Sequence, residues 1–165
     1  MMRTIAAVAA RLAMPEDETD IRVELPRWEE LPGGAAAFVL RVLAAARGAV
    51  PGEGALSVLL ADDAAVRELN RTFRGIDKST NVLAFPAAPG FGVGDVALAW
   101  ETVAREAEAQ GKTFAAHAAH LITHGYLHLR GFDHQADEAA EVMESAEREI
   151  LAELGVADPY LTNET

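Results

Sequence analysis

Histidine is the side chain in this sequence with the clearest capacity for chemistry, because all five histidines lie between residues 117 and 134. If the segment is helical through Leu129, a repeat of 3.6 residues per turn places the first four histidines within about 80° of arc on one face. Gly131 can end the helix in a left-handed conformation that a residue without a Cβ adopts at little cost. The chain can then turn back and bring His134 toward the same face. The stretch therefore predicts a cluster of imidazoles.

The last three histidines have the spacing of a metal site. His124, His128 and His134 follow the pattern H-x-x-x-H-x-x-G-x-x-H, which is the histidine and glycine spacing of the metzincin zinc proteases. The first two, four residues apart, can bind one ion from adjacent turns, and the reversal at Gly131 lets the third complete the set. Three neutral imidazoles suit Zn²⁺, with Ni²⁺, Fe²⁺ or Co²⁺ as alternatives, and they leave a fourth position for water. The spacing predicts one metal ion at a site of catalytic type.

Three polar residues near this pattern each allow two interpretations. His117 and His120 lie upstream on the same predicted helix, and they are either ordinary packed or exposed side chains or residues that orient the ligands or contact substrate. Asp133 either orients a ligand histidine through its second ring nitrogen or caps the turn.

Gly125 occupies the place where a zinc protease carries its glutamate. That glutamate deprotonates the metal-bound water and passes the proton to the leaving amine, and glycine can do neither. Peptide hydrolysis is therefore disfavoured unless Asp95, Asp133 or Glu101 supplies a carboxylate. A metal-bound hydroxide, whose parent water has a pKa of about 7, can still attack a phosphodiester or an ester.

The composition indicates one compact domain in a reducing compartment. A chain of 165 residues with 50% hydrophobic side chains can build one core but not two comfortable ones. We expect a loose N-terminal arm at 1–17 and a single metal-hydrolase domain at 18–165. The absence of cysteine excludes disulfides and thiolate metal sites. No apolar run reaches the roughly 18 residues that span a bilayer, so we expect no membrane partner and a cytoplasmic location.

The charge distribution indicates one candidate surface for an anion. A net charge of −12 argues against general nucleic-acid binding, since affinity for phosphates comes mostly from lysine and arginine. The segment 67–78 is the exception, because its four cations outnumber its two acids. Within it, Arg74 is either a clamp that grips a phosphate with two hydrogen bonds or an exposed cation at a helix end.

Hydrophobic periodicity predicts that strands and helices alternate along the chain. We expect strands at 21–25, 55–61, 80–85 and 94–100. We expect helices at 35–47, 64–73, 101–110 and 114–129, and a last helix that Asp137 caps and that runs to Leu154. The last two strands of this series are joined by a loop without a helix, and 80–85 should therefore pair antiparallel with 94–100. The pattern predicts an α+β fold, with a small mixed four-stranded sheet packed with about five helices.

Capping residues and apolar positions refine these helices. Asp62 or Asp63 should cap the second helix, Thr113 the fourth and Asp137 the last. The buried positions expected in the last helix are Val142, Met143, Ile150, Leu151 and Leu154. Its acidic side chains should form a solvated surface.

Three segments carry a family resemblance, namely HGYLHLRGFDH, LNRTFRGIDKSTNVLAFP and GDVALA. Together they resemble the YbeY family of bacterial metal-dependent endoribonucleases, also described as rRNA maturation factors. The resemblance implies a zincin-like fold, Zn²⁺ held by His124, His128 and His134, and a role in 16S rRNA 3′ end maturation and ribosome quality control. It also places the family's functional arginine at Arg74. Ala84 departs from the family's common serine, which leaves any role of that hydroxyl open.

The leading hypothesis is a zinc-dependent endoribonuclease that cleaves single-stranded RNA, with Arg74 at the scissile phosphate. A zincin-type metallopeptidase with a substitute base is the first alternative. A non-catalytic ribosome-assembly factor with a structural zinc is the second. Because the chain is so acidic, we expect a ribosomal or assembly-factor protein to bring it to rRNA.

Overall fold

The computed structural model describes residues 19–133 and 135–161. The arm expected at 1–17 and the predicted ligand His134 lie outside the described residues. The elements in chain order are β1 (Thr19–Val23), the 3₁₀ helix η1 (Pro26–Glu30), α2 (Ala35–Ala49), β2 (Leu56–Ala61), α3 (Asp63–Arg74), β3 (Val82–Pro86), β4 (Gly94–Ala99), α4 (Trp100–Ala109), α5 (Phe114–Leu129) and α6 (Asp137–Glu153). This series matches the predicted alternation, except that η1 was not predicted and that β1 begins and ends two residues earlier than expected.

The four strands form one mixed sheet in the order β1-β2-β4-β3. β2 pairs parallel with both β1 and β4, whereas β3 pairs antiparallel with β4, where Val82 lies opposite Leu98 and Pro86 opposite Gly94. The predicted antiparallel pair and the α+β class with a mixed four-stranded sheet are confirmed. β3 is an edge strand, which is where a strand can accommodate a proline.

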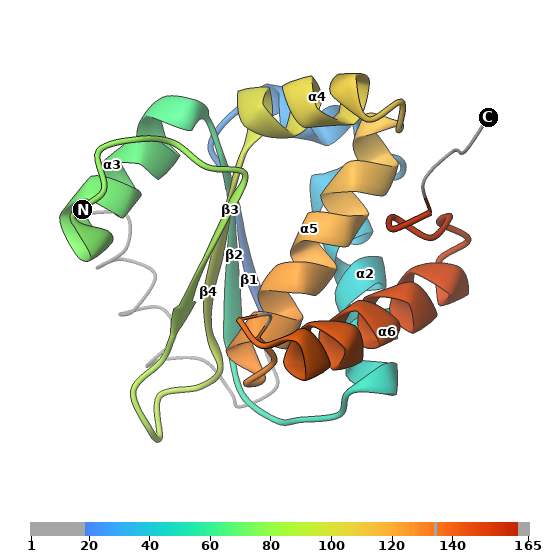
Figure 1. Cartoon of the computed structure of the whole chain (residues 1–165). Helices are drawn as coiled ribbons and strands as arrows, with labels where there is room; N and C mark the ends of the chain where they lie inside the picture. Colours follow the sequence, from blue (N-terminus) through green and yellow to red (C-terminus); the bar gives the residue numbers. More distant parts are fainter. Residues whose placement is uncertain (1–18, 134, 162–165) are drawn as a thin grey trace.

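Helices cover both faces of the sheet (Figure 1), with α3 on one face and α2, α5 and α6 on the other. Side chains of β2 alternate between these layers, as the two-residue period of a strand requires. Val58 and Leu60 belong to the larger core with α2 and α5, whereas Leu59 and Ala61 pack in the smaller core under α3. An apolar run of strand length is therefore buried on both sides, as expected for a central strand.

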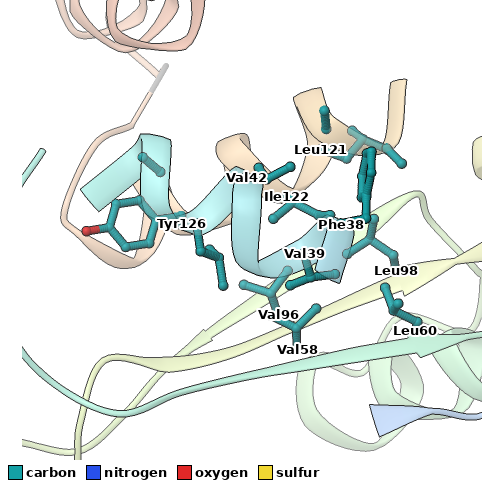
Figure 2. Packing of buried hydrophobic residues seen from close by; sticks show 14 of the residues in the cluster. Phe38, Val39, Val42, Val58, Leu60, Val96, Leu98, Leu121, Ile122 and Tyr126 are labelled. Carbon is teal, nitrogen blue, oxygen red and sulfur yellow. The ribbon is translucent and has the colours of Figure 1, made fainter. Parts of the chain in front are cut away.

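The larger core fixes α5 against the sheet. Figure 2 shows Val39 and Val42 of α2 beside Ile122 and Tyr126 of α5, above side chains from the central strands. Ile122 and Tyr126 are fully buried, and the Tyr126 hydroxyl donates a 2.8 Å hydrogen bond to the carbonyl oxygen of Val50. One face of α5 is thus committed to the core, which turns the histidine face away from it.

Local capping predictions are largely confirmed. Asp62 caps α3 by accepting a 2.8 Å hydrogen bond from the Ala65 backbone N–H, and Thr113 caps α5 by accepting one of 3.0 Å from Ala116. Asp137 is not a cap, because α6 begins at that residue and follows Ala136. A carboxylate in the first turn still interacts favourably with the helix dipole.

Two further predictions were wrong at the level of single residues. Val142 is 59% exposed, because α6 buries the stripe that contains Met143, Ile150 and Leu151, and Val142 points about 100° away from Met143. Trp100 does not end a strand but begins α4, since the pairing of β4 with its neighbours stops at Ala99. Among the described helices, none combines the length and the apolar character needed to cross a lipid bilayer.

Candidate metal and phosphate site

α5 places its histidines on one face, as the helical period predicts. The ring centroids of His117 and His120 lie 6.1 Å apart, and those of His120 and His124 lie 6.4 Å apart, each pair edge-on. His128 follows one turn later and is exposed. The two predicted ligands within the described residues therefore lie at the C-terminal end of the row, and His117 is buried near its start.

A buried glutamate of α6 faces this row. The Glu147 side chain is fully buried, and its two oxygens contact His120 Nε2 at 2.5 Å and His124 Nδ1 at 3.0 Å. The Tyr160 hydroxyl donates a 2.5 Å hydrogen bond to the same carboxylate. One side chain from α6 and one from the C-terminal segment thus hold two histidines of α5.

These contacts keep Glu147 ionised. Burial alone would raise the pKa of the Glu147 carboxyl, but hydrogen bonds from His120, His124 and Tyr160 outweigh it and lower that pKa to about 2. Burial and the bond to Glu147 raise the pKa of the Tyr160 hydroxyl, which therefore stays a donor. The site contains a fixed negative charge that no solvent reaches.

An ionised carboxylate at Nδ1 selects one tautomer of His124. The Nδ1 atom must carry the proton that it donates to Glu147, which in the neutral imidazole leaves the lone pair on Nε2. Carboxylate–histidine pairs of this kind orient metal-binding imidazoles and make them more basic. The donor set around His124 therefore fits a divalent metal ion.

Sequence reasoning missed Glu147. The acidic surface predicted for α6 is present at exposed positions such as Glu141 and Glu149, but Glu147 does not belong to it. The sequence did carry a signal for the burial of Glu147. This residue lies four positions after Met143 and four before Leu151, within the buried stripe of α6. A single glutamate in an apolar helical stripe indicates a buried partner, and here the partners are the histidines of α5.

Gly125 lies where α5 packs against the sheet. A Cβ built on Gly125 would lie 2.9 Å from Cγ1 of Val96 on β4 and 3.5 Å from Cγ2 of Val82 on β3. The first distance is shorter than side chains normally tolerate, so even alanine requires a shift in the packing. The missing protease glutamate therefore has a structural reason, because a longer side chain at this position would meet the sheet.

The proposed substitute bases are engaged in other contacts or lie in other elements. Glu101 accepts a 3.0 Å hydrogen bond from the backbone N–H of Asp63, at the start of α3. Asp133 accepts one of 2.6 Å from the backbone N–H of Gln135, which is the turn-capping role. Asp95 lies in β4 opposite Phe85.

Arg74 lies at the free edge of β3. Its Nη2 donates a 2.7 Å hydrogen bond to the Ala84 carbonyl oxygen, and its guanidinium carbon lies 5.2 Å from the centre of the Phe85 ring. The other face of β3 contacts α5 through Val82. Arg74 therefore reaches from α3 to β3, the strand against which α5 packs. A single strand, β3, separates Arg74 from α5.

The other arginines of the basic segment have carboxylate partners. Arg67 pairs with Asp77 at 2.9 Å, and Arg71 pairs with Glu68 at 2.6 Å. In residues 19–133 and 135–161, Arg74 makes no ion pair of this kind. Arg74 is thus the arginine of α3 whose charge is not already matched by a neighbouring acid.

No group of three metal-ligating side chains is assembled among the described residues. His124 and His128 have the expected i, i+4 placement on α5, whereas His134 lies outside the part of the chain that the structure describes. The predicted ligand set His124, His128 and His134 and the predicted catalytic residue Arg74 remain predictions.

Comparison with known proteins identifies a family. The family model described as "Endoribonuclease YbeY" matches residues 16–155. A protein named Endoribonuclease YbeY from Nitrobacter winogradskyi is 46% identical over 155 residues, which covers 86% of this chain and 81% of that protein. One of the same name from a Bradyrhizobium species is 43% identical over 162 residues, covering 91% and 96%.

The fold also matches a solved structure. The solution structure of TM1509 from Thermotoga maritima aligns with a TM-score of 0.60, over 88% of this chain and 97% of that one. The two sequences are 23% identical. At this level of identity the match supports the arrangement of strands and helices alone.

Proposed function

This chain belongs to the endoribonuclease YbeY family and is an RNA-cleaving hydrolase, and we propose that it cleaves single-stranded RNA at a zinc ion bound by His124, His128 and His134. The observation that carries the proposal is the pair of contacts from the buried Glu147 carboxylate to His120 and His124. A buried charge is costly, and it is retained where it orients groups that need it. His124 is such a group, because a metal ligand must be held in one orientation and one tautomer.

The ligand types favour zinc. Three neutral imidazoles suit Zn²⁺ better than Mg²⁺, which prefers oxygen ligands. A bound zinc ion would supply Lewis acidity and a water of lowered pKa. The chain's own contribution is to present Nε2 of His124 in the correct tautomer and to keep the remaining face of α5 dry through its core packing.

Arg74 is the residue proposed to bind the scissile phosphate. A guanidinium can hold two phosphate oxygens with parallel hydrogen bonds, and it stays charged at every relevant pH. The hydrogen bond from Nη2 to the Ala84 carbonyl fixes the guanidinium at the edge of β3. The position of Arg74 across one strand from α5 suits a phosphate held between the arginine and the metal.

The cellular role we propose is maturation of the 16S rRNA 3′ end and ribosome quality control in the cytoplasm. The net charge of −12 opposes binding to a bulk phosphate backbone. A ribosomal or assembly-factor protein would therefore deliver the enzyme to rRNA. Co-purification with ribosomal subunits at physiological salt tests this part of the proposal.

The decisive experiment compares cleavage of single-stranded RNA and of casein by protein with and without a chelator. We expect RNA cleavage that zinc restores after chelation and that is lost in both His128→Ala and Arg74→Ala. Arg71→Ala is the matched control, because Arg71 lies on the same helix and pairs with Glu68. Equal cleavage by all variants would identify a contaminating nuclease, and casein cleavage would favour the metallopeptidase alternative.

A further inference from the structure

A cavity of about 360 Å³ lies beside the histidine row. Its walls come from the start of β3, the end of α4, the histidine face of α5 and the C-terminal segment, and they include Asn81, Glu106, Gln110, His117, His124 and Tyr160. Polar side chains make up much of this lining, and His124 is shared with the proposed metal site. The cavity is therefore an extension of that site toward α4.

Glu106 is held rigidly in this cavity. Its Oε1 atom contacts His117 Nε2 at 2.8 Å and accepts a 2.9 Å hydrogen bond from Asn81 Nδ2. Asn81 is itself fixed, because its side-chain oxygen accepts a 2.7 Å hydrogen bond from the Val82 backbone N–H. Within the described part of the chain, no hydrogen bond reaches Glu106 Oε2. An oriented acceptor therefore faces a space large enough for a ligand.

The chemistry of this lining selects the ligand class. Lys112 also lines the cavity, where its ammonium group donates a 3.4 Å hydrogen bond to the Pro159 carbonyl oxygen. The Glu106 carboxylate repels phosphate and other anions, and it accepts hydrogen bonds from neutral N–H donors. The rings of His120 and Tyr160 also line the cavity, edge-on to each other with their centroids 5.5 Å apart. Aromatic and imidazole rings are the surfaces on which unstacked RNA bases rest. A flat, neutral, donor-bearing ring fits both features.

We propose that this cavity binds the nucleobase next to the scissile phosphate and that Glu106 selects bases with an exocyclic amino group. Adenine, cytosine and guanine each offer such a donor, whereas the only N–H on the pairing edge of uracil is flanked by two carbonyl oxygens that a carboxylate repels. This inference rests on the proposed RNA cleavage and specifies its substrate preference. It makes Glu106 a specificity residue rather than a catalytic one.

The placement along β3 is consistent with one nucleotide. The cavity touches Asn81 and Val82 at the start of the strand, and Arg74 binds the carbonyl of Ala84 two residues later. Two residues of a strand span about 7 Å. The cavity and the carbonyl that Arg74 contacts therefore lie two residues apart along β3, a separation on the scale of one nucleotide.

The test measures cleavage by zinc-loaded full-length protein of short single-stranded RNAs that differ only in the bases flanking one site. We expect cutting next to an amino-bearing base to exceed cutting next to uracil by about tenfold, the discrimination of one good base contact. Glu106→Gln should reduce the ratio to near one, because an amide can pair with uracil as well. Glu108→Gln removes the same charge from an exposed position of α4 and should keep the ratio.

If Glu106→Gln fails to fold, Gln110→Ala and a nucleoside titration provide a second test of the cavity. Gln110 is exposed and lines the cavity, so its loss should weaken cytidine binding without unfolding the protein. Cytidine, but not uridine, should shift the NMR resonances of His117 and Asn81. Equal cutting next to all bases, or an unchanged ratio in Glu106→Gln, would overturn the subsite. Cytidine binding without any RNA cleavage would keep the subsite and overturn the proposed function.

Discussion

Glu147 of α6 and His124 of α5 are 23 residues apart in the chain, yet the carboxylate of one lies 3.0 Å from Nδ1 of the other. The same carboxylate binds His120 and the Tyr160 hydroxyl. α6 and the C-terminal segment therefore hold the orientation of a predicted metal ligand.

Replacing Glu147 with glutamine should weaken metal binding more than folding. The amide keeps the size of the side chain but loses the charge that holds His124 in its Nδ1–H tautomer, and loss of such a partner typically lowers metal affinity about 10- to 100-fold. Competition with a chromophoric chelator measures the zinc affinity. Nitrogen NMR of the His124 ring should show a mixture of tautomers.

The matched control for this variant is Glu149→Gln, which removes the same charge from an exposed position of α6. Its zinc affinity should equal that of the unmodified protein. If the two variants bind zinc equally well, Glu147 has no role in positioning His124.

Replacing Gly125 with alanine should destabilise the fold by about 1–3 kcal/mol, the usual range for an added methyl in a tight core. The new Cβ would lie 2.9 Å from Val96 Cγ1, which forces α5 away from the sheet. Urea unfolding of the zinc-free protein measures the effect. Val96→Ala in the same chain should restore part of the loss, because it removes the obstructing methyl groups.

Gly48→Ala is the control for helix propensity. Gly48 also lies in a helix, and a Cβ there would meet no atom within 4 Å. This substitution should be neutral or stabilising by up to about 1 kcal/mol. A Gly125→Ala variant as stable as Gly48→Ala would show that the contact with Val96 relaxes at no cost.

Arg74→Ala should lower RNA cleavage by about 100-fold, which is typical for the loss of a donor that stabilises developing charge. Stability should fall by only about 1 kcal/mol, because the hydrogen bond to the Ala84 carbonyl lies at the sheet edge. Arg74→Lys keeps the charge but not the planar fork, so it should recover only part of the rate. Full activity of Arg74→Lys would show that Arg74 contributes only its positive charge and not its planar geometry.

Acid pH should destabilise the protein through His117. Burial lowers the pKa of the His117 imidazole, although the hydrogen bond and charge of Glu106 partly oppose this effect. The unfolded chain therefore takes up a proton near the ordinary pKa of 6.5 that the folded protein resists, and stability falls as the pH drops below that value. Above pH 6.5 this loss of stability is absent.

The measurement compares melting temperatures of the unmodified protein and His117→Gln from pH 8 to pH 5.5. Glutamine can still donate to Glu106 but does not titrate, so the unmodified protein should lose more stability over this range. His120, Lys112 and Glu106 surround His117 in both proteins, and their contributions cancel in the comparison. A constant difference between the two curves would show that His117 is not the titrating group.

Local features of the sequence were sufficient to place α5 and its histidines. The 3.6-residue period predicted the row, Thr113 marked its start, and the helix ends at Leu129 as expected. The start of α3 was predicted at Asp62 or Asp63, and Asp62 is the residue that caps it. These features depend on hydrogen bonds and side chains a few residues apart, so they are visible in the order of residues alone.

The sequence by itself therefore determined the helix, its histidine spacing and the absence of a protease glutamate. Only the tertiary structure decided that a glycine is required at 125, because that requirement comes from Val96 on another element. It also decided that Glu147 is buried against His124 and that Arg74 docks on the edge of β3. These contacts join residues brought together by the packing of helices on a sheet, and no local period records which distant side chains will meet there.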